Sequence, residues 1–359
     1  MTRRRALLIA ASIVLACLIR PAFVSGVRQV ALTLPERLSD REFWDMVSNF
    51  SEPNGSFRSD NLLSNETAIQ YVIPDLTRIA KPGRVYLGVG PEQNFTYIAA
   101  LKPAMAFIVD IRRGNLDLHL MYKALFELSA DRAEFVSRLF SKKRPDGLGA
   151  KSTVAEIFAA YSNVDTSETL YNENLEAIKN QLATRHGFEV SGDLRGIEYV
   201  YHAFFTYGPQ IQYSSTGSFG GPYQPTYANL MVATDGGGQA RGYLSSEEMF
   251  QLLKDLQSRN MVVPIVGNFV GPKAIRSVGT YLKGKAAMVS AFYLSNVEQF
   301  LYQDGTWRDF CANAASLPLD ETSMFIRAVR GGGLGRGMGL NSDLGEMAAD
   351  LKDCAASRP

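Results

Sequence analysis

The sequence Arg84-Val85-Tyr86-Leu87-Gly88-Val89-Gly90-Pro91-Glu92-Gln93 is typical of a short β-strand that ends in a glycine-containing turn. An apolar helix is predicted from about Asn94 to Leu101, where Lys102-Pro103 ends it. Residues 105–109 then form a second buried strand, which ends at Asp110. A strand, a helix and a strand in this order predict a βαβ unit with two parallel strands.

The same alternation returns later in the chain. We expect a long helix at about 115–140, strands at 230–234, 261–266 and 287–293, and helices that begin near Ser245 and Pro272. Because parallel strands need long crossover connections, this pattern predicts an α/β fold with a doubly wound, mainly parallel, Rossmann-like sheet. We assign residues 84–359 to this domain, with a helical insertion at about 141–210.

Residues 27–83 are expected to form N-terminal helices and a polar lid segment. Ser39 and Glu42 have the spacing of a capping box and predict the start of the first helix. A second helix is predicted from Asn65 to Ala80. The stretch between them, residues 51–61, is too rich in polar and turn-forming residues to be core.

The charge of the chain is nearly balanced, with 37 basic and 36 acidic residues among 359. A chain without a strong global field has no general attraction for nucleic acid, so we expect a small-molecule partner recognised by a local site. Because the chain has three histidines and no Cys-x-x-Cys or His-x-x-x-His spacing, we expect no structural metal site.

The first 26 residues are typical of a signal peptide. Three arginines precede an apolar stretch at 6–19, which is shorter than the roughly 20 residues that span a bilayer, and Val24-Ser25-Gly26 supplies small residues for cleavage. We therefore expect an exported or membrane-associated protein, in the periplasm or at the inner membrane. An uncleaved anchor with the domain facing the cytoplasm is the alternative.

Cysteine usage is compatible with export. Cleavage after Gly26 would remove Cys17 and leave Cys311 and Cys354, which an oxidising compartment could join in a disulfide. Two unpaired buried thiols are the alternative.

The glycine turn and the acid that follows it predict a site for a nucleoside-containing cofactor. Gly88 and Gly90 let the backbone approach a ligand closely. Asp110, at the end of the next strand, is placed to accept hydrogen bonds from ribose hydroxyls. A tight turn with a helix-capping Asp is the alternative. Two features disfavour NAD. Gln93 occupies the position of the third glycine in the dinucleotide fingerprint, and the negative charge of Glu92 would repel a pyrophosphate but not a sulfonium.

This arrangement resembles the glycine-rich first motif and the acidic second motif of class I S-adenosylmethionine-dependent methyltransferases. The resemblance covers residues 84–110 and, more loosely, 230–296. It implies that S-adenosylmethionine is the cofactor, that Gly88 and Gly90 line its methionine moiety and that Asp110 binds its ribose. The whole chain also resembles a family of uncharacterised bacterial proteins, which implies no particular reaction.

Other polar residues extend the candidate site. Asp235, directly after the expected strand at 230–234, is a candidate catalytic residue at the same crevice, with a plain loop as the alternative. Asn268 and Asn296 also follow expected strands and are candidate substrate-binding residues that could orient the substrate or the adenine. A simple turn role is the alternative for both.

The polar lid segment supplies further candidates. Arg58 is a candidate to bind a carboxylate or phosphate of the substrate, and Asn61 is a second candidate contact. Asp60 or Glu66 is a candidate catalytic base. A solvated loop with helix caps is the alternative.

Two main hypotheses follow. The first is a methyltransferase-like enzyme that binds S-adenosylmethionine and acts on a small acceptor. The second is a non-catalytic, periplasmic or membrane-associated protein that binds a small metabolite, which the departures at Leu87 and Gln93 from the methyltransferase and dinucleotide patterns favour. A nicotinamide-dependent oxidoreductase is a third, weaker hypothesis.

Overall fold

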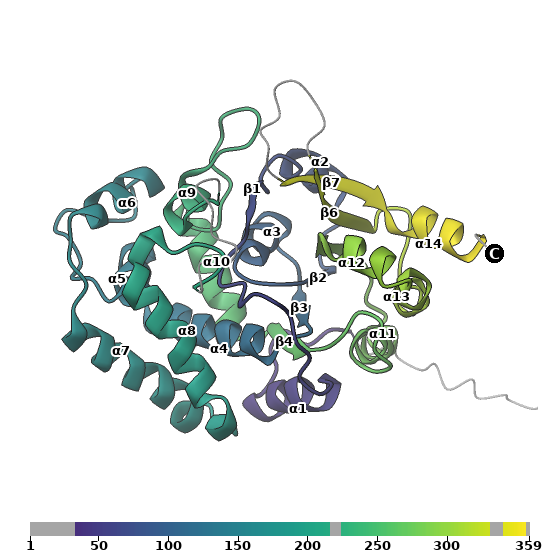
Figure 1. Cartoon of the computed structure of the whole chain (residues 1–359), viewed down its shortest axis with the longest axis horizontal. Helices are drawn as coiled ribbons and strands as arrows, with labels where there is room; N and C mark the ends of the chain where they lie inside the picture. The colour runs from purple at the N-terminus through teal and green to yellow at the C-terminus, as the bar shows by residue number, and fades with distance from the viewer. Residues whose placement is uncertain (1–32, 216–223, 331–339, 357–359) are drawn as a thin grey trace, which may run out of the picture. The chain divides into compact units, whose positions relative to one another are not determined.

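The computed structural model describes residues 33–215, 224–330 and 340–356. The leader expected at residues 1–26 lies outside these ranges. The strands of the described residues are β1 (Glu66–Ala68), β2 (Val85–Gly88), β3 (Met105–Asp110), β4 (Val262–Val266), β5 (Val289–Ser295), β6 (Met324–Arg330) and β7 (Leu340–Glu346). They form a seven-stranded sheet in the order β1-β7-β6-β5-β2-β3-β4. Neighbouring strands are parallel except β6 and β7, so the sheet is mostly parallel (Figure 1).

Helices connect and cover these strands, which gives the mixed α/β architecture that the sequence predicts. The α-helices of the described residues are α1 (Asp40–Phe50), α2 (Ile73–Ile79), α3 (Gln93–Leu101), α4 (Arg113–Leu128), α5 (Arg132–Phe140), α6 (Val154–Ser162), α7 (Glu168–Asn180), α8 (Leu194–Tyr207), α9 (Tyr227–Val232), α10 (Glu247–Ser258), α11 (Ala274–Gly284), α12 (Val297–Gln303), α13 (Trp307–Ala314) and α14 (Met347–Ala356). Helices α6, α7 and α8 lie in the stretch where a helical insertion is predicted, and α8 packs against α4 (Figure 1).

The βαβ unit predicted from residue 84 onward is confirmed. β2 and β3 pair in parallel, with Val85 opposite Met105 and Leu87 opposite Phe107, and α3 connects them. Every residue of both strands is buried. Strands that are covered on both faces have continuous apolar sequences rather than alternating ones, which is why this unit is visible in the sequence.

The N-terminal helix begins as predicted. The backbone N–H of Glu42 donates to Ser39 Oγ, and the backbone N–H of Ser39 donates to the Glu42 carboxylate, which completes the capping box. The second predicted helix is much shorter than residues 65–80. Residues 66–68 form β1 instead, and α2 begins at Ile73, where Pro74 occupies the first turn that proline favours.

The strand predicted at 230–234 is wrong, because residues 230–232 form the end of helix α9. α9 begins at a capping box in which Thr226 and Asn229 bond to each other's backbone N–H. Its buried residues, at helical spacing, are Tyr227, Leu230 and Met231. A short apolar run does not by itself distinguish a strand from a buried helix, and here the local cap favours the helix. Asp235 therefore does not stand at the end of a strand.

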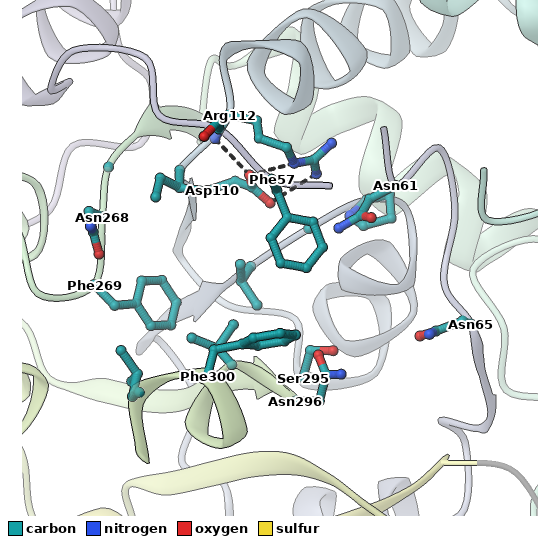
Figure 2. A pocket seen from close by; sticks show the side chains of 18 of the residues that line it. Phe57, Asn61, Asn65, Asp110, Arg112, Asn268, Phe269, Ser295, Asn296 and Phe300 are labelled. Carbon is teal, nitrogen blue, oxygen red and sulfur yellow. Dashed lines mark hydrogen bonds and ion pairs between the residues drawn. The ribbon is translucent and has the colours of Figure 1, made fainter. Parts of the chain in front are cut away.

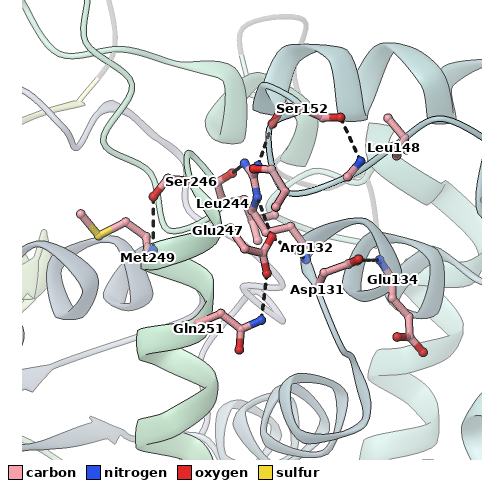
Figure 3. Close-up of polar contacts among 12 residues, drawn as sticks. Asp131, Arg132, Glu134, Leu148, Ser152, Leu244, Ser246, Glu247, Met249 and Gln251 are labelled. Carbon is pink, nitrogen blue, oxygen red and sulfur yellow. Dashed lines mark hydrogen bonds and ion pairs between the residues drawn. The ribbon is translucent and has the colours of Figure 1, made fainter.

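The single helix predicted at 115–140 is also wrong, because it is two helices. α4 ends at Leu128, and Asp131 caps α5 by accepting a hydrogen bond from the backbone N–H of Glu134. Arg132, only 2% exposed, anchors this break. Its guanidinium donates to Glu247 of α10 and to the backbone oxygens of Leu244, Ala150 and Ser152 (Figure 3). A buried guanidinium needs such a set of acceptors to offset its lost hydration.

The C-terminal part of the described chain contains the antiparallel pair and a disulfide. Cys311 of α13 and Cys354 of α14 are joined, which is one of the two states that the sequence leaves open. Among the described residues, none of the helices combines the length and the apolar character needed to cross a membrane.

Candidate functional site

A cavity of about 380 Å³ lies at the carboxyl ends of β2, β3, β4 and β5 (Figure 2). β3 contributes Asp110, and the turns that follow the other three strands contribute Gly90, Gly267 and Asn296. Because parallel strands end at the same edge of a sheet, residues far apart in sequence meet at this edge. The cavity is therefore the place where several of the predicted site residues come together.

The turn between β2 and α3 forms one wall of the cavity. Gly90 has a φ of +79°, a left-handed conformation that favours glycine. Asn94, in the first turn of α3, fixes the turn from beneath. Its side-chain amide donates to the backbone oxygens of Val89 at 3.0 Å and Pro91 at 2.7 Å.

Gly88 serves this packing and does not line the cavity. A Cβ atom at Gly88 would lie 1.9 Å from Asn94 Oδ1 and 2.8 Å from the Tyr86 hydroxyl oxygen. The absent side chain leaves room for Tyr86 to donate a hydrogen bond to Asn94 at 2.8 Å. Gly88 is thus needed for the turn, whereas Gly90 forms the surface that a ligand would meet.

His119 of α4 supports the same turn. Its Nε2 lies 2.9 Å from the backbone oxygen of Gly90, which requires the tautomer that carries the proton on Nε2. Full burial lowers the pKa of His119 to about 4, so the imidazole is neutral near pH 7. This histidine is a support for the cavity wall rather than a group inside it.

Asp110 lines the cavity, but its carboxylate is already paired. Arg112 donates its backbone N–H to Asp110 Oδ1 at 2.9 Å and its Nη2 to Oδ2 at 3.2 Å, and its Nε lies 3.2 Å from Oδ1 (Figure 2). Both side chains are less than a tenth exposed. A carboxylate has about four lone-pair sites, so this pairing leaves capacity for one further donor.

The polar segment 51–61 crosses the ends of β3 and β4, where the sequence places a covering segment. The backbone N–H of Glu52 donates to Val266 and that of Gly55 donates to Ile111, both at 2.8 Å. These bonds fix the segment to the sheet edge and place Phe57 in the cavity wall.

Of the candidates on this segment, Asn61 lines the cavity, whereas Arg58 and Asp60 face a neighbouring one. Asp60 accepts hydrogen bonds from the Tyr199 hydroxyl and from the backbone N–H of Ser215. The guanidinium of Arg58 lies 5.5 Å from the centre of the Phe300 ring. The two residues therefore do not contact the main cavity.

One side of the main cavity is aromatic. The rings of Phe57 and Phe300 meet edge to face at 5.4 Å, and Phe269 lies on the same side (Figure 2). Phe300 comes from α12 and Phe57 from the polar segment, so this side is assembled from parts distant in sequence. Such a surface suits a planar ring.

The opposite side carries uncharged polar groups. Asn296 and Asn65 line it together with Ser295 and Asn61 (Figure 2). Asn268 lines the cavity next to Phe269, and its side-chain oxygen accepts from the backbone N–H of Val270, the turn role that the sequence left open. Amides and hydroxyls can orient a ligand by hydrogen bonds without adding net charge.

Two predicted carboxylates lie behind the wall rather than in it. Glu66 is fully buried, and its Oε1 accepts a hydrogen bond from Ser295 Oγ at 2.7 Å and another from the Tyr293 hydroxyl. Glu92 is also fully buried and accepts from the backbone N–H of Ser64 at 3.2 Å. Burial raises the pKa of Glu66, and it raises the pKa of Glu92 to about 8.

Asp235 lies outside both of these cavities. Its Oδ1 accepts from the backbone N–H groups of Gly237 at 2.8 Å and Gln239 at 2.9 Å, and its Oδ2 accepts from Arg241. The contact with Arg241 lowers the pKa of Asp235. The residue closes a loop, as the alternative interpretation of this glycine-rich stretch predicts.

Several residues of the site were not predicted as site residues, among them Arg112, Asn94, Phe57 and Phe300. Two of them could have been found in the sequence. Arg112 is a basic residue two positions after the acid at the end of β3, and Asn94 is an amide in the first turn of an apolar helix. Phe57 and Phe300 carried no such signal, because an aromatic residue in a loop or a short helix has many other uses. Among the described residues, no group of three or more His, Cys, Asp or Glu side chains could hold a metal ion.

Comparison with known proteins identifies the family. The model of the family described as Domain of unknown function (DUF7790) matches residues 62–195 and 220–342, which is most of the chain. The chain therefore belongs to this family. No curated protein matches it in sequence.

Proposed function

We propose that the main cavity binds an adenosyl ligand of the S-adenosylmethionine class and that the protein is methyltransferase-like, acting on a small acceptor. The observation that carries this proposal is the position of Gly90, Asp110 and Asn268 at the ends of three adjacent parallel strands around one cavity. The resemblance in the sequence places the same glycine turn and the same acid around the methionine and ribose parts of the ligand.

The order of the strands supports a doubly wound, Rossmann-like fold as the basis of this site. Numbered along the chain from β2, the order β4-β3-β2-β5-β6 is 3-2-1-4-5, and it reverses between β2 and β5. In open sheets of this kind, ligands bind at the carboxyl ends of the strands beside such a reversal. The cavity occupies this place.

The charges of the cavity favour a sulfonium ligand over a pyrophosphate. Among its described lining residues Arg112 is the one cation, and Asp110 pairs with it. A dinucleotide would bring two phosphate charges to a wall without a free cation. Glu92 does not repel a pyrophosphate as the sequence suggests, because it is buried behind the turn and a pKa of about 8 leaves it largely neutral at pH 7.

Calorimetry on the full-length protein tests the proposal. We expect S-adenosylmethionine or S-adenosylhomocysteine to bind more tightly than NAD. Absence of binding heat with both adenosyl ligands, in a sample whose folding is verified by circular dichroism, would contradict the proposal.

A second candidate function is a non-catalytic metabolite-binding protein, and two observations favour it. Asp110 is held by Arg112, which leaves it little capacity for a ribose, and the Cys311–Cys354 bond is of the kind that persists in oxidising compartments. Because S-adenosylmethionine is made in the cytoplasm, cell fractionation with and without residues 1–26 separates the candidates. An exported, disulfide-bonded protein supports the binder, whereas a cytoplasm-facing protein supports the enzyme.

A further inference from the structure

The polar wall between Asn61 and Ser295 contains buried hydrogen-bond acceptors. Gln93 is 2% exposed, and among the described residues its side-chain oxygen Oε1 has no hydrogen-bond partner; the same is true of the side-chain oxygen of Asn61. Both residues line the cavity. A buried acceptor without a partner costs free energy, so each of these amides would gain a partner by turning its oxygen towards a donor or a cation in the cavity.

Ser295 adds a third acceptor to this wall. Its hydroxyl proton is donated to Glu66 Oε1 at 2.7 Å, so only lone pairs of Ser295 Oγ remain for a ligand. Ser295 has a φ of +52°, which is uncommon for a residue with a side chain, and it stands where the pairing of β5 with β6 shifts register. This backbone conformation places the Ser295 hydroxyl between the cavity and Glu66.

The Ser295 hydroxyl thus separates Glu66 from the cavity. A second chain of hydrogen bonds also connects Glu66 to a residue of the cavity wall. Gln93 Nε2 donates to the Tyr293 hydroxyl at 3.2 Å, and Tyr293 in turn donates to Glu66 Oε1. The other carboxylate oxygen, Oε2, is buried and has no hydrogen-bond partner of good geometry among the described residues, although Ser342 of β7 is close enough to lower the pKa of the carboxyl. Both hydrogen bonds to Oε1 lead from residues of the cavity wall, directly from Ser295 and through Tyr293 from Gln93.

Among the residues that the structure describes, none that faces Glu66 carries a positive charge that would stabilise its ionised form. The titratable groups that face it from the described elements are Tyr86 of β2, Tyr97 of α3, Tyr293 of β5 and Glu92 of the β2–α3 turn. Burial raises the pKa of each tyrosine well above its usual value, so these side chains stay neutral. A cation in the cavity would therefore be the main electrostatic partner of Glu66.

We propose that Asn61, Gln93 and Ser295, with Glu66 behind them, form a cation subsite that holds the sulfonium or ammonium centre of the ligand, and that Glu66 ionises when this cation binds. This inference rests on the proposed function and deepens it, because it names the part of an adenosyl ligand that the subsite selects. The proton that leaves Glu66 goes to solvent, and the ligand's positive charge takes its place beside the carboxylate.

The test compares two ligands that differ in this charge. S-Adenosylmethionine carries a sulfonium, whereas S-adenosylhomocysteine carries a neutral thioether at the same atom. The sulfonium also lowers the pKa of the ligand's own amino group, so the two ligands are compared at or below about pH 7, where both amino groups are protonated and the ratio of the dissociation constants isolates the sulfonium. We expect the full-length protein to prefer S-adenosylmethionine by about tenfold at about pH 7, and by less at about pH 5.5, because lower pH keeps more of Glu66 protonated.

Glu66→Gln should bring this ratio close to one at both pH values, because glutamine keeps the shape and the acceptor but cannot ionise. Asp304→Asn is the matched control, since Asp304 also lines the cavity but is exposed at its rim. Its effect on the ratio should be small and should vanish in about 0.5 M salt, because salt screens exposed charges far more than buried ones.

Calorimetry of the native protein in two buffers of different ionisation enthalpy gives a measurement that needs no variant. S-Adenosylmethionine should release up to about one proton more than S-adenosylhomocysteine on binding. Equal proton release, or a sulfonium preference that persists in folded Glu66→Gln, would overturn the cation subsite while leaving the proposed function in place. If neither adenosyl ligand binds, the proposed function fails and the subsite fails with it.

Discussion

At the scale of single residues, the pairing of Asp110 with Arg112 changes what a substitution should do. A strand-end acid that faces only a crevice could be removed without loss of stability. Asp110→Ala instead leaves the Arg112 guanidinium, whose side chain is 9% exposed, without its carboxylate. We expect a loss of about 3–5 kcal/mol in the free energy of unfolding, measured by urea denaturation, because an unpaired buried charge is costly.

The double variant Asp110→Ala/Arg112→Met provides the control for this prediction. Removing both charges should cost about 2 kcal/mol less than the sum of the two single changes, since each single change leaves an unpaired partner. Additive effects would show that the two side chains act independently.

Two buried titratable groups around the turn after β2, Glu92 and His119, should change the free energy of unfolding with pH in opposite directions. Unfolded chains release a glutamate proton near pH 4.5, whereas Glu92 in the fold releases its proton near pH 8. The folded state therefore binds more protons between these values, and the stability that Glu92 contributes at low pH is lost as the pH rises through about 8. Glu92→Gln should abolish a loss on the order of 4 kcal/mol, seen in urea denaturation across this range.

His119 is the matched contrast, because its pKa is lowered from 6.5 to about 4. For this group the unfolded chain binds more protons, so stability present above pH 6.5 is lost as the pH falls towards 4. His119→Gln should flatten the acid limb and leave the alkaline limb unchanged. Between about pH 4.5 and 6.5 the two contributions cancel in the native protein, so each is measured as the difference in stability between the native protein and the variant, and a difference that does not change with pH would contradict the assignment of that residue.

At the scale of elements, the disulfide between α13 and α14 makes a separate prediction. It closes a loop with a sequence separation of 43 residues, which in the chain-entropy model stabilises the fold by about 3–5 kcal/mol. Cys311→Ala/Cys354→Ala should lower the free energy of unfolding by roughly this amount in urea denaturation. Cys17→Ser is the control, because Cys17 forms no part of the bond, and it should leave the unfolding curve of the oxidised protein unchanged.

The elements also show which parts of the fold the sequence can predict. β2, β3 and β4 are buried on both faces, so their continuous apolar sequences identify them. β7 has the sequence Leu-Asn-Ser-Asp-Leu-Gly-Glu, which carries no such signal, because its place depends on pairing with β6. In 230–234 Leu230 and Met231 are buried but Val232 is exposed, and the cap at Thr226 makes the segment a helix rather than a strand.

At the scale of the whole molecule, the rule that parallel strands end at one edge predicts which residues meet. It correctly brings Gly90, Asp110, Asn268 and Asn296 around one cavity, although more than 200 positions separate the first from the last. It does not predict the direction of a side chain. Asp110 turns to Arg112 and Glu66 turns away from the cavity, because each finds its partners in segments whose position the strand pattern leaves undefined.

The last prediction couples the cavity to global stability. A ligand that binds only the folded state at about 100 times its dissociation constant stabilises that state by about 2.7 kcal/mol. With an unfolding entropy of about 2.1 cal/mol/K per residue, this corresponds to a rise of about 4 °C in the melting temperature of a chain of this size. We expect S-adenosylhomocysteine to produce this rise in differential scanning calorimetry, and NAD at the same concentration to produce less. Phe57→Ala should reduce the rise without lowering the melting temperature of the free protein by more than a few degrees, because Phe57 is a partly exposed residue of a loop that lines the cavity. An equal shift with both ligands, or with neither, would contradict a cavity that selects adenosyl compounds.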